Sequence, residues 1–145
     1  MVFPPHDLTH FAVETTLGYG GAFYGLIADG WEISDFAKPW ARGPIPAEAR
    51  EVETLVSVFE SITRRVASPT AAEVNSWAEE YVASRNAAKP GSADPLRELT
   101  ADEIERVAQT RTALLDQWSS LAPGEALELA FVLPRCDMKS RRTRV

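Results

Sequence analysis

Apolar side chains recur at intervals of three and four residues through much of the chain, and this spacing constrains the fold more than any other feature. It predicts helices over residues 46–67, 70–84 and 100–118, because such a repeat gathers apolar side chains on one helical face. Two of these segments begin with the pattern Thr-x-x-Glu, at Thr70 and Thr100. In that pattern the threonine and glutamate side chains cap each other's backbone amides, so it marks a helix start. The sequence therefore predicts a mainly α fold.

Two shorter helices are expected in the first thirty residues. Proline fits the first turn of a helix and Gly18 is a typical C-terminal stop, so the first helix should span residues 5–17. A second should follow over residues 22–30. Residues 31–46 mix glycine and proline with aromatic side chains, which predicts an irregular segment whose aromatic rings pack on the helices. Any ligand pocket is expected between the first helix and this segment.

The end of the chain has a different repeat. Large apolar residues occupy every second position there, namely Leu127, Leu129, Phe131 and Leu133. This two-residue period predicts a short β-strand over residues 127–133. We therefore expect about five helices with a short C-terminal β-strand, in one helical domain over residues 1–134. An exposed edge of the strand would favour a homo-oligomer, and residues 135–145 are expected to form a disordered basic tail.

The chain has 145 residues and a net charge of −6, and the basic tail makes the remainder more acidic still. An acidic body disfavours nucleic acid and anionic membrane surfaces as partners, because both need a concentrated basic face. The longest apolar run, residues 22–28, is too short to span a bilayer. A single cysteine, Cys136, excludes an internal disulfide and a cysteine-rich zinc site. With no secretory signal in view, these features predict a cytoplasmic protein.

The two histidines of the chain, His6 and His10, lie four residues apart in the first predicted helix. Four residues bring a side chain back to within about 40° and advance it by about 6 Å, so both imidazoles project from one face. Two neutral imidazoles on one rigid helix can supply two ligands of a metal ion, with zinc as the expected metal. Glu14 is too far along the helix to join His6 on one ion. The acids of the following segment, from which a third ligand would come, are Asp29, Glu32 and Asp35.

The run His6-Asp7-Leu8-Thr9-His10 resembles, over these five residues, the H-E-x-x-H motif of the zincin metalloproteases. The resemblance implies that both histidines bind zinc and that Asp7 stands in the place of the general base that activates the metal-bound water. In the gluzincin type the third ligand is a glutamate on a later helix, which points to Glu32, twenty-two residues after His10. Asp7 departs from the motif because aspartate is one methylene shorter than glutamate.

The opening segment is also similar to a group of uncharacterised small bacterial proteins that begin with the pattern P-H-D-L-x-H-x-x-V-E. The likeness covers about the first thirty residues, including Val13 and Glu14, and it implies no activity.

Two functional hypotheses follow from these residues. In the first, favoured by the sequence alone, the protein is a non-catalytic binding or assembly module. Asp7 then stabilises the start of its helix, His10 is hydrogen-bonded at the margin of the core and Glu14 is solvated. In the second, the protein is a metal-dependent hydrolase that binds its metal through His6, His10 and Glu32, with Asp7 as the base. Stoichiometric zinc in the purified protein would separate the two.

Overall fold

The computed structural model describes residues 4–132 and is mainly helical, as the sequence predicts. Its α-helices are α1 (Pro4–Leu17), α2 (Phe23–Ala28), α3 (Ala47–Thr63), α4 (Ala71–Ala88) and α5 (Ala101–Ser119). A short 3₁₀ helix, η1 (Ile33–Phe36), interrupts the segment that was expected to be irregular. None of the helices in this part of the chain combines the length and the apolarity needed to cross a membrane.

The starts of α4 and α5 confirm the two caps predicted from the sequence. At α4 the Glu73 amide donates to Thr70 Oγ1 over 3.2 Å, and the Thr70 amide donates back to the Glu73 carboxylate over 2.7 Å. At α5 the same reciprocal pair joins Thr100 and Glu103, with both bonds 3.2 Å long. Each cap supplies partners for amides that have none inside the helix, so each fixes where its helix begins.

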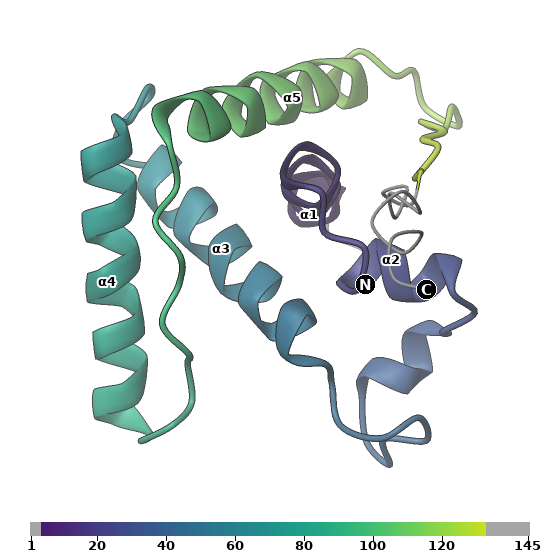
Figure 1. The fold of residues 1–145 in the computed structure, drawn as a ribbon. Helices are drawn as coiled ribbons and strands as arrows, with labels where there is room; N and C mark the ends of the chain where they lie inside the picture. The colour runs from purple at the N-terminus through teal and green to yellow at the C-terminus, as the bar shows by residue number, and fades with distance from the viewer. Residues whose placement is uncertain (1–3, 133–145) are drawn as a thin grey trace, which may run out of the picture.

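Helix α1 lies near the centre of the helical assembly and is seen almost end-on in Figure 1. It packs against α5, α3 and α2, whereas α4 packs on α3 and contacts α5. The largest side chains of the core come from α3, where Leu55, Phe59 and Ile62 each expose 2% of their surface or less. Burial of such side chains is the main force that holds the helices together. Neighbours on three sides therefore fix the orientation of α1 and of the side chains that project from it.

The predicted C-terminal strand is absent from the part of the chain that the structure describes. Residues 127–132 have no regular secondary structure there, and Leu133 lies outside the described residues. The predicted basic tail, residues 135–145, also lies outside them. A strand needs a neighbour to complete its hydrogen bonds, and alternation of apolar residues does not supply one. The homo-oligomer expected through this strand stays a prediction.

The apolar side chains of this terminal segment pack on helices instead. Leu127 packs against the small cluster formed by Leu8, Ala12 and Leu114. The ring of Phe131 lies 6.3 Å from the ring of Phe11 and 6.0 Å from that of Tyr24, centroid to centroid. The alternating residues therefore cover α1 and α2 without forming a strand.

Candidate metal centre

His6 and His10 lie on one face of α1, as their spacing predicts. Their imidazole rings meet edge to face, with the ring centroids 4.8 Å apart. His10 is buried, with 5% of its surface exposed, whereas His6 is half-buried. The neighbouring helices therefore enclose one imidazole and leave the other accessible.

Glu53 of α3 approaches both imidazoles. Its Oε2 lies 2.8 Å from His10 Nε2, and its Oε1 lies 3.6 Å from His6 Nε2. One ligand atom from each of the three residues can be chosen so that all lie within 4.8 Å of one another. Zinc binds imidazole nitrogen and carboxylate oxygen at about 2.0–2.2 Å. Two ligands bound at these lengths lie at most about 4.2 Å apart, so small shifts of the three side chains would bring the atoms around a single ion.

The remaining nitrogen of each imidazole faces another carboxylate. His6 Nδ1 lies 3.2 Å from both carboxylate oxygens of Glu60, which is also on α3. His10 Nδ1 lies 3.5 Å from Glu14 Oε2. Histidines that bind metals usually donate their second ring N–H to a carboxylate or carbonyl, which fixes the tautomer and the ring orientation. Both imidazoles are thus oriented with Nε2 toward Glu53 and Nδ1 toward a supporting carboxylate.

Glu14 is wholly buried, with 0% of its surface exposed, which corrects the expectation that it is solvated. Its Oε1 accepts a 2.9 Å hydrogen bond from the Tyr24 amide in the first turn of α2. Within residues 4–132, its Oε2 and His10 Nδ1 are buried without a well-formed hydrogen bond, so the 3.5 Å contact between them acts mainly through charge. A buried carboxylate is costly unless it has such partners. Glu14 therefore ties the orientation of His10 to the position of α2.

The charges around His10 favour its protonated form when no metal is bound. Burial alone lowers the pKa of His10, but the neighbouring Glu14 and Glu53 carboxylates outweigh burial and raise that pKa to about 9. The pKa of Glu53 is lowered, chiefly by the hydrogen bond with His10, and the charge of Arg85 on α4 contributes to the same direction. Without a metal, His10 and Glu53 therefore form a charged ion pair.

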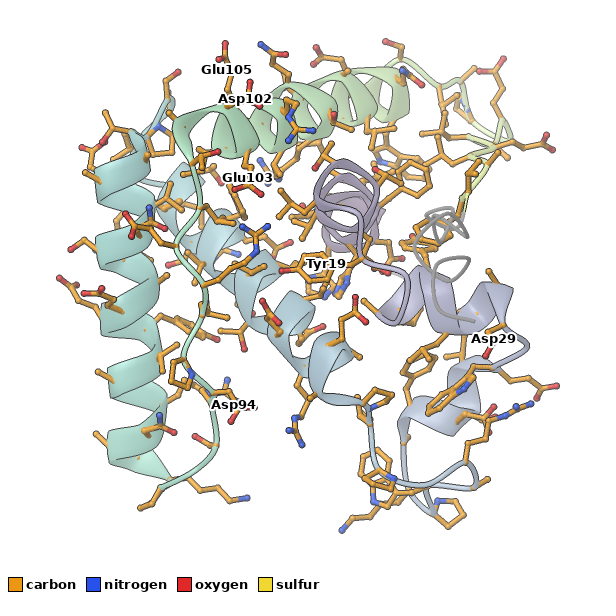
Figure 2. All side chains as sticks on the ribbon, viewed as in Figure 1. Tyr19, Asp29, Asp94, Asp102, Glu103 and Glu105 are labelled. Atoms are coloured by element: carbon orange, nitrogen blue, oxygen red, sulfur yellow. The ribbon has the colours of Figure 1, made fainter. Side chains whose placement is uncertain are left out.

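The acids expected to supply the third ligand lie elsewhere. Glu32 is exposed, and its side chain accepts from the Asp35 amide in the cap of η1. The Asp35 carboxylate already accepts hydrogen bonds from the Glu32 amide, over 2.8 Å, and from Arg42 Nε, over 3.0 Å. Asp29 is exposed at the end of α2 (Figure 2). The structure brings Glu53 rather than Glu32 to the histidines, because α3 packs along this part of α1.

A cavity of about 510 Å³ opens beside the three candidate ligands. Asp7, the residue that the zincin resemblance places as general base, lines it together with His6, His10 and Glu53. Phe36 and Ile45, of the segment that was expected to bound a pocket with the first helix, line part of it. Most of the remaining lining comes from α3, from the end of α4 and from the connection between α4 and α5, which the sequence did not predict. Its volume is typical of sites for small molecules, which span about 300–1,000 Å³.

Glu53 and Glu60 were not among the residues predicted from the sequence, because they come from a helix far from the histidines in the chain. A usable signal was present, since the two glutamates lie seven residues apart in the predicted helix over residues 46–67. Seven residues complete almost two turns, so both side chains lie on one helical face. Nothing in the sequence pairs that face with the histidine face of the first helix.

Comparisons of the chain with protein-family models, with curated proteins and with solved structures gave no match. The side chains around His6 and His10 are therefore the basis for inferring a function.

Proposed function

We propose that the protein binds one divalent transition-metal ion, best matched by zinc, through Nε2 of His6, Nε2 of His10 and the carboxylate of Glu53. One observation carries this proposal: both imidazoles direct Nε2 toward the same carboxylate while a second carboxylate supports each Nδ1. A chance ion pair needs only one carboxylate per histidine. Here one carboxylate, that of Glu53, faces the Nε2 atoms, and other carboxylates face the Nδ1 atoms. A second carboxylate at the far ring nitrogen is typical of histidines that bind metals.

Three protein ligands leave a fourth position for water, which is the arrangement of catalytic rather than structural zinc sites. Zinc lowers the pKa of bound water to about 7 and so makes it a nucleophile at neutral pH. The cavity beside the centre gives a substrate access, and Asp7 in its wall would accept the proton of the water. On this proposal the protein is a metal-dependent hydrolase with Glu14 and Glu60 as positioning residues. A non-catalytic binding module is the competing proposal, and it requires no metal.

Zinc titration of the untagged full chain tests the metal centre, with Glu53→Ala as the informative variant. We expect one zinc per chain in calorimetry, and an affinity on the order of 1,000-fold lower in Glu53→Ala, since about 10–16 kcal/mol of zinc binding would be shared by three protein ligands. Glu51→Ala is the matched control, because Glu51 lies on the same helix and lines the same cavity but bonds to Tyr19 Oη at 2.9 Å. Absence of stoichiometric binding in the wild type, or equal losses in both variants, would contradict the metal centre.

Asp7→Asn tests the role of the base separately from metal binding. With 4-nitrophenyl acetate as the probe, we expect zinc-dependent hydrolysis that falls about 100-fold in Asp7→Asn, because a positioned general base typically contributes a factor of that order. Zinc affinity should stay at the wild-type value, since Asp7 is not one of the three ligands. Hydrolysis that does not depend on zinc would leave a metal-binding protein without hydrolase chemistry. Zinc-dependent hydrolysis that is unchanged in Asp7→Asn would remove Asp7 as the base.

A further inference from the structure

The cavity beside the proposed centre has both apolar and cationic lining. The apolar part is formed by Phe23, Phe36, Ile45 and Ala49. The cationic part consists of Arg50 on α3 and Arg85 near the end of α4. Apolar surface with a few placed polar groups is typical of a site for a small organic molecule, and arginine is well suited to holding an acidic group.

The two arginines differ in the ion pairs and hydrogen bonds that their side chains already form. Arg50 Nη2 lies 3.4 Å from Asp94 Oδ2, and both side chains are largely exposed, so this ion pair is weak. Asp94 lies on the connection between α4 and α5 (Figure 2). Arg85 is exposed and forms no ion pair with a carboxylate anywhere in residues 4–132. Its guanidinium donates to the Tyr81 hydroxyl over 3.4 Å and lies over the ring of the same residue, 5.9 Å from the centroid. Arg85 is therefore the cation that remains available to a ligand.

The carboxylates in the lining limit how much negative charge a ligand can carry. Glu51 is held by Tyr19 and Asp94 by Arg50. Asp7 and Glu53 also line the cavity, beside the proposed metal centre. These groups repel a dianion such as a phosphate monoester more strongly than a single carboxylate. One available arginine matches one negative charge.

We propose that this cavity binds a small monocarboxylate with an apolar body, whose carboxylate pairs with Arg85 and whose body contacts Phe23 and Phe36 beside the metal centre. The inference rests on the proposed function only in placing the ligand next to a bound metal. It assigns Arg85 as the residue that selects for the acidic group. It also gives the hydrolase proposal a substrate class, a small molecule with a free carboxylate.

The full chain, freed of metal by dialysis so that no open zinc position can bind the anionic probes, can be titrated by NMR with three probes of similar shape: phenylacetate, the neutral phenylacetamide and the dianionic phenyl phosphate. We expect phenylacetate to bind about threefold to fivefold more tightly than the other two, because a charge-assisted pair with the exposed Arg85 side chain is lost in the amide. The variant Arg85→Gln should lose that preference. Lys89→Gln removes the same charge four residues further along the chain, at the C-cap of α4 and outside the cavity lining, and should behave like the wild type.

Equal binding of phenylacetate and phenylacetamide, or a preference that survives in Arg85→Gln, would overturn this inference. Tighter binding of phenyl phosphate would overturn the monocarboxylate class. Zinc titration of the same samples keeps the two proposals apart. Normal zinc binding without a carboxylate preference removes only the ligand, whereas failure of wild-type zinc binding removes the metal centre.

Discussion

The metal-free protein is expected to lose roughly 3 kcal/mol of stability between about pH 6 and about pH 9.5, through the titration of His10 alone. The pKa of His10 is about 9 in the folded chain and about 6.5 in an unfolded one. A group whose pKa rises on folding contributes stability that is fully present below the unfolded value. That contribution is lost as the pH rises through the folded value. Urea denaturation at a series of pH values, in the presence of a chelator, measures this change in the free energy of unfolding.

The variant His10→Gln isolates this effect, because glutamine does not titrate. Its free energy of unfolding should be nearly constant over the same pH range, while Glu51→Ala should retain the wild-type decline. A flat profile in the wild type, or an equally steep decline in His10→Gln, would show that the proton is not held between Glu14 and Glu53. Saturating zinc should reverse part of the wild-type decline, since a metal competes for His10 with the proton and binds better at high pH.

Phe59→Ala is expected to reduce the free energy of unfolding by about 3–5 kcal/mol. Phe59 exposes 1% of its surface and lies in the core cluster with Val13 of α1, Val74 of α4 and Val107 of α5. Its removal leaves a void that rigid helices cannot close, in addition to the lost burial. Urea denaturation at pH 6 measures the change without interference from His10.

Two further variants keep this test informative if Phe59→Ala fails to fold. Phe59→Leu retains most of the volume and should cost less than about 1.5 kcal/mol. Ile33→Ala removes an equally apolar residue that is 74% exposed, and it should change stability by no more than about 0.5 kcal/mol. Similar losses in Phe59→Ala and Ile33→Ala would mean that the core is not centred on α3.

The helical part of the fold was predictable because its signals are local. Apolar periodicity and the caps at Thr70 and Thr100 depend on residues within a few positions of each other, and they identified the helices. The predicted strand failed for the complementary reason. Whether an alternating segment forms a strand depends on a distant partner, and Leu127 and Phe131 find helices instead.

Two of the three candidate ligands were predictable for the same reason. His6 and His10 share a face because four residues of one helix separate them, which needs no knowledge of the rest of the chain. Glu53 reaches them only through the packing of α3 on α1, so the choice of Glu32 had no local evidence against it. The burial of Glu14 could not be predicted from the sequence either, because the neighbouring helices create it.

The double engagement of Glu14 restricts what can replace it. Aspartate would be too short by one methylene to reach both the Tyr24 amide and the His10 ring from the same backbone position. Glutamine could still accept from the amide, but it would withdraw the negative charge that favours a proton or a cation on His10. A substitution of Glu14 is therefore expected to change both the stability of the protein and its affinity for ions, and the two effects cannot be separated at this residue.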